Sequence, residues 1–296
     1  MGRMWDNKAL RGLQTKRYLA AIVMIAVMFV SFRFQENQAV DLLNKMIARN
    51  AEIQTLEYNM TGKERIKDKI IEKTTYFKIN INPYKVYFRQ KIIGIDVEGF
   101  YGTLTRNNKI AIKTKGFPWI SANFDPMDNM MRNNHHHTIH EAGFNYMVGL
   151  VKYLMLKHKE DLNKKISVKG IEKVNNRDCY KIVMNIDEFH YMKYKIQKGE
   201  TLPVIAKKYM ISDYMIMEKN KEIGGYDDVK EGQQILIPSD YAKQIVFLLD
   251  KDLLVPARIE LYDDLGLYAE YSFYNIVTNP IVTDKEFKKR QPKRQK

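Results

Sequence analysis

The feature that most constrains the fold is a series of segments between residues 56 and 116 in which apolar side chains alternate with polar or charged ones. A period of two is typical of a β-strand with one buried face, and Gly, Asn, Asp and Pro83 separate the segments. We therefore predict antiparallel strands with one face in water. The segments are residues 56–66, 73–81, 85–92, 97–105 and 108–116.

Two segments change to the helical period. Residues 39–50 carry apolar side chains at i, i+3, i+4 and i+7 spacing, and residues 137–158 carry a broad apolar stripe. The strand pattern resumes at 166–175 and 178–187, stops between Asp187 and Gln244, and returns at 243–252, 254–263 and 267–277. We therefore predict an α+β fold in which one long sheet is interrupted by an insertion.

The charge lies mainly at the ends of the chain. The net charge is +14, and residues 1–17 and 285–296 together carry ten of these charges. A nucleic-acid-binding protein would concentrate them on a folded face, so we expect no nucleic-acid partner. Residues 285–296 are predicted to form a basic disordered tail. The single cysteine, Cys179, excludes an internal disulfide and is expected to be buried in a strand.

The first 34 residues are predicted to direct export. Lys16 and Arg17 precede an apolar run from Tyr18 to Val30, which Arg33 ends. This run is shorter than the roughly 20 residues of a membrane-spanning helix and fits a signal peptide. No small-x-small cleavage site follows it. Residues 1–34 are therefore a signal peptide or an uncleaved anchor in the inner membrane, and we expect the protein in the periplasm or cell envelope.

Around the insertion, the chain resembles the lipoprotein-carrier superfamily of LolA/LolB-like half-barrels. The resemblance rests on the order of helix and long strands, on "NPYKVYFR" at 82–89, and on the closing strands of 248–279. It covers residues 39–190 and 242–284. It implies a curved antiparallel β half-barrel with covering helices around a cavity that carries acyl chains or other apolar ligands. Large apolar groups on both faces of 267–277 agree with such a cavity, although ordinary sheet packing explains them equally well.

The insertion reads as a complete strand–helix–helix–strand (βααβ) unit. Gly199 turns the chain, Thr201 can cap a first helix containing Pro203, and Ser212 or Asp213 can cap a second one. Residues 194–238 resemble a LysM module, and we assign residues 191–241 to it as an autonomous unit with adjacent ends. The residues that carry the resemblance are Tyr194, Gly199, Glu200, Thr201, Leu202, Ile205, Ala206, Tyr209, Asn220, Gly232, Gln233, Leu236, Ile237 and Pro238.

The LysM resemblance implies binding of N-acetylglucosamine glycans, chiefly peptidoglycan. By position, one side of the groove would be Gly199, Glu200, Thr201 and Leu202, and the other Gly225, Tyr226 and Asp227. Glu200 stands where Asp is commoner, and the loop that contains Tyr226 is longer than usual. The alternative is that Gly199 and Thr201 serve only as turn and helix cap.

One histidine-rich segment, residues 135–141, has the spacing of a metal site. On a helix His136 and His140 would share a face, as would His137 and Glu141, and imidazoles at that spacing can bind zinc. Polar residues also collect at helix starts, and we favour a structural role for this cluster. No nucleophile elbow, phosphate loop or carboxylate pair stands out, so we predict no catalytic residues and no cofactor.

The sequence thus predicts an exported, non-enzymatic envelope protein. Its half-barrel would bind a lipid or other apolar ligand, its LysM module would bind peptidoglycan, and it would meet the membrane only through its N-terminal segment. The alternative is a metal-dependent cell-wall hydrolase that LysM targets to the wall and whose site is the His135–Glu141 cluster.

Overall fold

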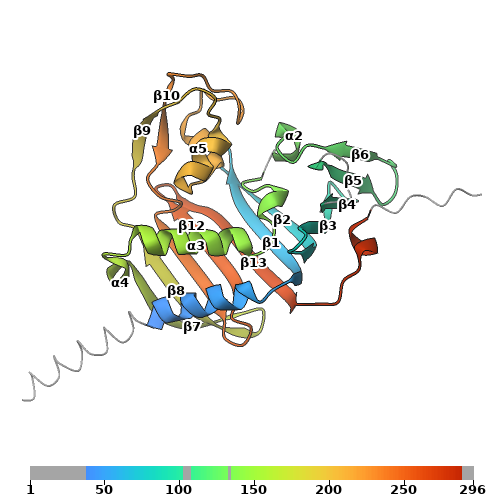
Figure 1. Ribbon diagram of the computed structural model, residues 1–296, viewed down its shortest axis with the longest axis horizontal. Coiled ribbons are helices and arrows are strands. Elements are labelled where there is room, and N and C mark those ends of the chain that lie inside the picture. The colour runs from blue at the N-terminus through green and yellow to red at the C-terminus, as the bar shows by residue number, and fades with distance from the viewer. Residues whose placement is uncertain (1–37, 103–107, 133–134, 289–296) are drawn as a thin grey trace, which may run out of the picture.

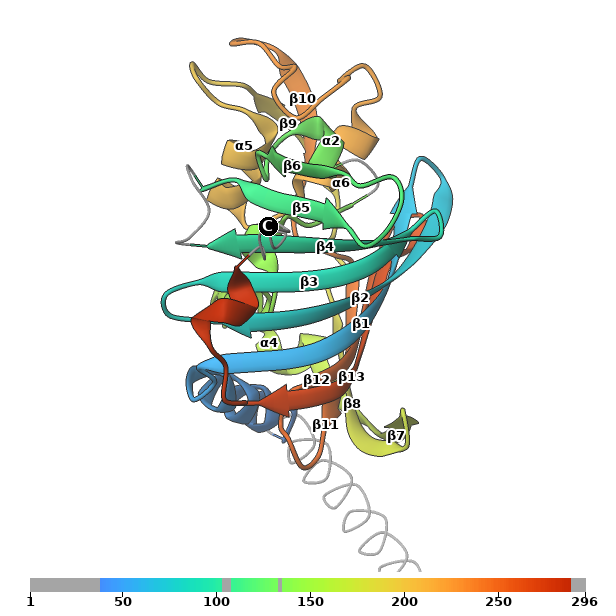
Figure 2. The ribbon, with the colours of Figure 1, turned by 90° about the vertical axis from the view of Figure 1, so that its right-hand side faces the viewer.

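One large antiparallel sheet organises the molecule (Figures 1 and 2). The computed structural model describes residues 38–102, 108–132 and 135–288, so the predicted export segment lies outside the described residues. Eleven of the described strands form this sheet in the order β6-β5-β4-β3-β2-β1-β13-β12-β11-β8-β7. Their bounds are β1 Thr55–Ile66, β2 Lys69–Asn80, β3 Lys85–Ile92, β4 Ile95–Gly102, β5 Ile110–Thr114, β6 Ser121–Phe124, β7 Ile166–Val174, β8 Arg177–Asn185, β11 Gln244–Asp250, β12 Pro256–Asp263 and β13 Gly266–Thr278.

The predicted strands and their antiparallel pairing are confirmed, and tight turns set their register. Lys67 and Asp68 both have positive φ, 48° and 65°, and they join β1 to β2 immediately after the pair Ile66 and Lys69. Asn175 and Asn176, with φ of 49° and 65°, do the same between β7 and β8. Two left-handed central residues are the signature of the two-residue turn that suits the twist of a hairpin. Strand β6 is an element that the sequence did not predict.

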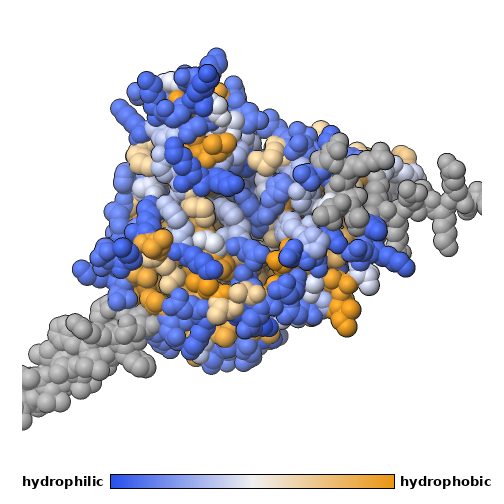
Figure 3. Space-filling model, viewed as in Figure 1, coloured by the Kyte–Doolittle hydropathy of each residue, from blue (hydrophilic) through white to orange (hydrophobic). Residues whose placement is uncertain are grey.

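Helices cover one face of this sheet. The N-terminal helix (residues 38–51) and α3 (Asn145–Lys157) lie on the same face in Figure 1, and their apolar sides join one continuous core with the sheet. Figure 3 shows a largely hydrophilic exterior on this side, with apolar groups gathered around these helices. Short helices α2 (Asn129–Arg132) and α4 (Leu162–Lys165) connect the strands. None of the helices in the described ranges is long and apolar enough to cross a membrane.

The second predicted helix begins later than its periodicity indicates. Residues 137–158 were expected to be helical, but α3 starts at Asn145, after a short 3₁₀ helix η2 (Ile139–Glu141). Tyrosines from the sheet bind the backbone of this segment: the Tyr84 hydroxyl donates to the Ile139 and Ala142 carbonyls at 2.8 and 3.1 Å. The Gly143 N–H donates to the Tyr58 hydroxyl at 3.1 Å. These bonds replace helical ones and hold residues 135–144 as an irregular cover over the sheet.

The insertion lies between two neighbouring strands of the sheet. Strands β8 and β11 pair directly, with Asn185 opposite Gln244, so the sheet continues across the gap in the chain. Between them stand β9 (Tyr191–Lys195), α5 (Leu202–Tyr209), α6 (Asp213–Lys219) and β10 (Gln234–Pro238), in the predicted order. Tyr191 pairs with Pro238, which brings the ends of the unit together as expected. Ser212 caps α6 by accepting a hydrogen bond from the Met215 N–H.

The βααβ unit packs closely against the sheet domain. Its buried residues belong to the same core as those of the sheet. The Ser212 hydroxyl lies 2.7 Å from that of Tyr268 on β13. Arg65 on β1 forms paired hydrogen bonds of 3.0–3.1 Å with Glu218 on α6 and also binds the buried Asp263. The second helix of the unit thus packs into the sheet domain, and the autonomous folding of residues 191–241 stays a prediction.

The predicted disordered tail also starts too early. Residues Asp284–Phe287 form the 3₁₀ helix η3, and Phe287 is only 3% exposed. The Lys85 ammonium lies 2.6 Å from Asp284, and the Lys78 ammonium 2.5 Å from Glu286. Residues 285–287 are thus part of the fold, while 289–296 lie outside the described residues.

Ending the chain after Thr283 should lower the free energy of unfolding by about 2 kcal/mol, because burial of Phe287 is lost. Ending it after Lys288 should leave stability unchanged. Urea unfolding of the two truncated proteins and the full chain measures both values. Equal stability of the Thr283 truncation and the full chain would contradict the docking of η3.

Candidate functional site

A partly open cavity of about 210 Å³ lies between the concave face of the sheet and its helical cover. Its floor comes from β1, β2, β3, β5, β11, β12 and β13, and its roof from residues 135–144 and α3. Most lining residues are apolar: Tyr58, Met60, Phe77, Phe88, Ile110, Met147, Leu150, Val151, Leu154, Ile245, Phe247, Ile259, Leu261 and Phe273. Polar ones are Glu64, Lys73, Thr75, Gln90, His135, His137, Thr138, Glu141, Tyr241 and Tyr271.

The strand register arranges these side chains as a gradient. An aromatic row, in which Tyr58, Phe77 and Phe88 lie opposite one another, crosses β1, β2 and β3. Two residues closer to the β1–β2 turn, the next row is Met60, Thr75 and Gln90. Beyond it, Gly62 lies opposite Lys73, and Glu64 follows on β1. The cavity therefore passes from an aromatic end to a charged end within a few residues of each strand.

Glycine at position 99 makes room for the aromatic row. A Cβ atom there would lie 2.0 Å from the ring of Phe88, so the ring occupies the space that any other side chain would fill. The ring thus lies across β4, and its edge contributes to the cavity floor. A larger residue at position 99 would force Phe88 to move.

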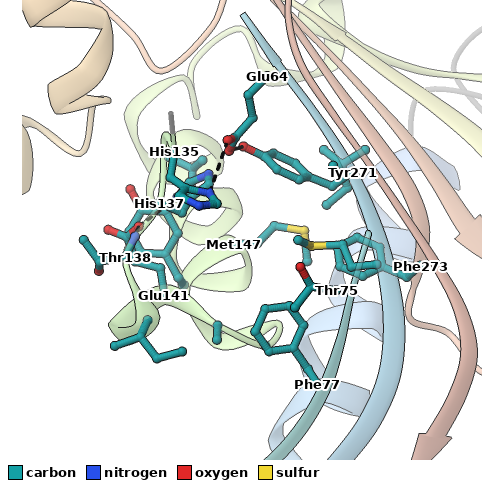
Figure 4. A pocket seen from close by; sticks show the side chains of 18 of the residues that line it. Glu64, Thr75, Phe77, His135, His137, Thr138, Glu141, Met147, Tyr271 and Phe273 are labelled. Atoms are coloured by element: carbon teal, nitrogen blue, oxygen red, sulfur yellow. Dashed lines mark hydrogen bonds and ion pairs between the residues drawn. The ribbon is translucent and has the colours of Figure 1, made fainter. Parts of the chain in front are cut away.

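Hydrogen bonds order the charged end (Figure 4). The Tyr271 hydroxyl donates to Glu64 at 2.6 Å, and the Lys73 ammonium lies 3.0 Å from His135 Nε2. His135 Nδ1 is 3.9 Å from the Glu64 carboxylate. On the roof, His137 Nδ1 lies 2.8 Å from Glu141, whose carboxylate also accepts the Thr138 N–H at 3.1 Å. Two carboxylates, two imidazoles and an ammonium thus meet at one end of an apolar cavity.

Burial and pairing set the charges of these groups. Burial lowers the pKa of His135 to about 4, and the positive charge of Lys73 adds to this effect, so the imidazole is neutral at pH 7 and accepts from the ammonium. Burial also lowers the pKa of Lys73. For His137 burial opposes the charged form, but the hydrogen bond and the charge of Glu141 outweigh it and raise the pKa. The same partnership outweighs burial at Glu141 and lowers the pKa of its carboxyl group.

The structure disperses the predicted metal cluster. His136 is buried and stacks between Tyr214 and Tyr268, at centroid distances of 4.6 and 4.1 Å, while its Nε2 lies 2.9 Å from the Arg65 carbonyl. His140 is exposed beside the ring of Tyr101. The expected shared face of His136 and His140 is therefore wrong, because these residues do not lie on one helix. His137 and Glu141 do meet.

In the described part of the chain, no group of three or more His, Cys, Asp or Glu residues is placed to hold a metal ion. Cys179 is buried, and burial raises the pKa of its thiol to about 11. The buried position is the one that its strand pattern predicts.

The predicted glycan-binding residues fall into an open group and a covered one. In the open group, Gly199 has a φ of +77°, and beyond its two chain neighbours no residue has an atom within 4 Å of where a Cβ would be. The Glu200 carboxylate accepts the Tyr194 hydroxyl at 2.7 Å and the Gln197 N–H at 2.9 Å, which orders the loop before Thr201. Leu202 is buried.

The covered group lies beneath helix α2. The Arg132 guanidinium is 3.4 Å from the ring centroid of Tyr226 and binds Asp213 on α6 at 2.7 Å. A Cβ atom at Gly225 would lie 3.3 Å from the Asn129 side-chain amide. Asp227 remains exposed. The Leu202 N–H donates to the Tyr226 carbonyl at 3.0 Å, so the two predicted groups do adjoin each other.

Comparison with family profiles matches residues 53–223 to one described as a protein of unknown function (DUF1571). The chain belongs to the DUF1571 family. In this DUF1571 protein, the matched region spans β1 to α6 and contains Glu64, Lys73, His135, His137 and Glu141 of the charged end, but not Tyr271. No curated protein matches the chain.

Solved structures that match this DUF1571 protein share little sequence with it, and their TM-scores are low. Lipoprotein LppX from Mycobacterium tuberculosis is 8% identical, with a TM-score of 0.38, over 84% of this chain and 99% of that one. LprF from Mycobacterium bovis is 12% identical, with a TM-score of 0.42, over 83% and 95%. A LolA superfamily protein from Nitrosomonas europaea is 9% identical, with a TM-score of 0.29, over 85% and 97%.

Sequence reasoning missed Glu64, Lys73 and Tyr271 as site residues. A signal for two of them was available. Glu64 continues the alternate positions that begin with Tyr58, and Lys73 shares a face with Phe77, so each places a charge on the apolar face of its strand. Such a charge is costly unless it is paired, and two in adjacent strands predict a pair across the hairpin.

We expect the stability of the protein to fall as the pH drops below about 6.5. His135 and His136 have lowered pKa values in the fold, so the unfolded chain takes up protons there that the native state excludes. Each such histidine adds about 1.4 kcal/mol per pH unit to the slope. His136→Phe keeps the stacked ring and removes one such proton. Urea unfolding at pH 7 and pH 5 should therefore show a smaller loss in this variant than in the wild type, and equal losses would contradict the assignment.

Proposed function

We propose that this DUF1571 protein binds an amphiphile with an acyl or alkyl chain, the chain lying in the aromatic end of the cavity and the polar group at the charged end. The observation that supports it best is the gradient from Tyr58, Phe77 and Phe88 to Lys73 and Glu64 within one cavity. The cavity has a volume of about 210 Å³. A cavity of about 10–15 Å³ is enough to hold one water molecule. The space is therefore large enough for a chain of many atoms.

The contents of the charged end favour an amphiphile over a wholly apolar ligand. Glu64 and Glu141 are anionic partners of Tyr271 and His137, and desolvating such groups beneath a hydrocarbon would be costly. A ligand that places hydroxyl, carboxylate or phosphate oxygens there can exchange hydrogen bonds with the Lys73 ammonium and the imidazoles. The N-terminal sequence supports an envelope location, where such amphiphiles are abundant.

Filling the aromatic end should abolish binding of a chain-bearing probe. Met147→Trp replaces a flexible side chain in the cavity with a bulky indole ring. Leu156→Trp, on the same helix and 69% exposed, is the matched control. Titration with dansyl-undecanoic acid should give a Kd raised at least about tenfold in Met147→Trp and unchanged in Leu156→Trp. Circular dichroism checks that both variants are folded. Wild-type affinity in a folded Met147→Trp protein would refute the chain site.

We also propose that the βααβ unit binds peptidoglycan as a LysM module. The support is its element order, its adjacent ends and the exposed loop at Gly199 beside Thr201. Because Arg132 covers Tyr226, contacts to the glycan would come from residues 199–201 and Asp227 rather than from the tyrosine ring. The cluster at 135–141 takes no part in this proposal.

Sedimentation of the full chain with an excess of insoluble peptidoglycan tests the module. Thr201→Ala combined with Asp227→Ala should reduce the bound fraction, while Glu222→Ala combined with Glu231→Ala, on exposed residues of the same unit, should not. A single module of this size binds with a Kd on the order of micromolar to millimolar, which is why the wall must be in excess. Soluble fragments released from the wall during incubation would instead support the hydrolase alternative.

A further inference from the structure

Two neighbouring turns at one edge of the sheet expose apolar side chains. Ile93, in the β3–β4 turn, is 97% exposed, and Phe117 and Trp119, in the β5–β6 turn, are 86% and 78% exposed. Ile92 and Ile120 beside them are 44% and 49% exposed. Turns in water normally carry Gly, Asn, Asp, Ser or Pro at such positions, so five large apolar groups there require another explanation.

The two turns form one surface, which we name the turn edge (residues 91–95 and 115–120). Strands β4 and β5 pair, and the Lys115 N–H donates to the Asp96 carbonyl at 2.8 Å. Figure 2 shows both turns projecting on the same side of the molecule, near the β1–β2 turn. The large apolar side chains of the two turns are thus exposed on the same side of the molecule.

The β5–β6 turn is held in shape by its backbone, so its aromatic rings do not pack inward. The Thr114 N–H donates to the Ile120 carbonyl at 3.0 Å, and the Ile120 N–H donates to the Pro118 carbonyl at 2.8 Å. The Ile120 N–H also lies 3.0 Å from the Thr114 hydroxyl oxygen. Phe117 and Trp119 take no part in these hydrogen bonds, and their side chains are exposed.

Exposed cations surround the apolar groups. Lys91 and Lys115 belong to the turn edge, and Lys67 and Lys69 lie in or beside the neighbouring β1–β2 turn. The acidic groups of the same turns are the exposed Asp68 and the half-buried Asp96. Beneath them, Glu98 pairs with Lys113 and Lys115. A group of Trp, Phe and Ile side chains with lysines around it suits a lipid bilayer, because the bilayer surface is anionic and its interior is apolar.

The charged end of the cavity faces the same edge. Along β3, Phe88 and Gln90 line the cavity, and Ile92 is the next residue on that face before the turn. Along β2, the lining residues run from Phe77 to Lys73 toward the β1–β2 turn. The polar group of a bound amphiphile would therefore lie nearer to the turn edge than its chain would.

We propose that the turn edge docks on an anionic lipid bilayer, with Ile93, Phe117 and Trp119 at the level of the headgroups and the surrounding lysines on their phosphates. This surface is separate from the cavity, and its membrane contact does not depend on which ligand the cavity holds. It also differs from a tether through residues 1–34, because it orients the sheet domain itself against the membrane.

Trp119 reports this contact directly. The only other tryptophan is Trp5, so Trp5→Phe leaves a full-length chain with one fluorophore, located in the turn edge. On addition of vesicles of phosphatidylethanolamine and phosphatidylglycerol, its emission should shift to shorter wavelength and be quenched by lipids with brominated chains. Because the signal comes from the turn, it is independent of how the N-terminal segment associates with the vesicles.

Variants in this background separate the contributions. Ile93→Ser or Phe117→Ser should weaken the vesicle titration about tenfold, and Lys91→Gln or Lys115→Gln about fivefold, with an effect that salt removes. Ile281→Ser, a 98% exposed residue beyond the far end of β13, should change nothing. Trp119 emission that ignores vesicles, or that responds only to added envelope protein, overturns the proposal. So does a vesicle response that Phe117→Ser leaves unchanged.

Discussion

The pairing of the first strand with the last holds this fold together. Strand β1 pairs with β13 from Leu56 opposite Thr278 to Glu64 opposite Ala269, and this contact joins the β1–β6 meander to the strands that follow residue 166. The cavity lies across this seam. Met60 stands opposite Phe273, and the Tyr271 hydroxyl reaches Glu64 at 2.6 Å, so neither half of the sheet forms the site alone.

Residues beside the β1–β13 pairing also attach the βααβ unit to the sheet. Arg65, at the end of β1, binds Asp263 in the sheet domain and Glu218 on α6. His136, from the cavity roof, stacks between Tyr268 on β13 and Tyr214 on α6. Removing one member of such a buried set leaves an unpaired charge or an unfilled space, which usually costs several kcal/mol. The roof, the β1–β13 pairing and the unit are therefore in direct contact with one another.

Local pattern was sufficient to predict the strands, the order of the inserted unit and the continuation of the sheet beyond it. Each depends on the period of two, on turn residues or on helix caps, which act over a few residues. The start of α3 was not predictable in this way, because Tyr58 and Tyr84, more than fifty residues away, bind the backbone of residues 139–143, which do not continue α3. The same holds for the tail: charge predicts disorder from residue 285, but Phe287 is buried against the sheet.

Only part of the candidate site could be predicted from the sequence, for the same reason. The histidine cluster was visible, yet its members separate into a stacked ring at His136, a carboxylate partner at His137 and a solvent-exposed ring at His140. What gives the cavity its chemistry is the register of β1 and β2, which sets Lys73 opposite Gly62 and close to Glu64. At position 62 the Tyr271 ring lies 3.4 Å from where a Cβ atom would be, so glycine lets this ring lie over β1. A one-residue slip would turn both charges to the convex face. The polarity of the cavity is thus encoded in strand register, which the two-residue turn at Lys67 and Asp68 fixes.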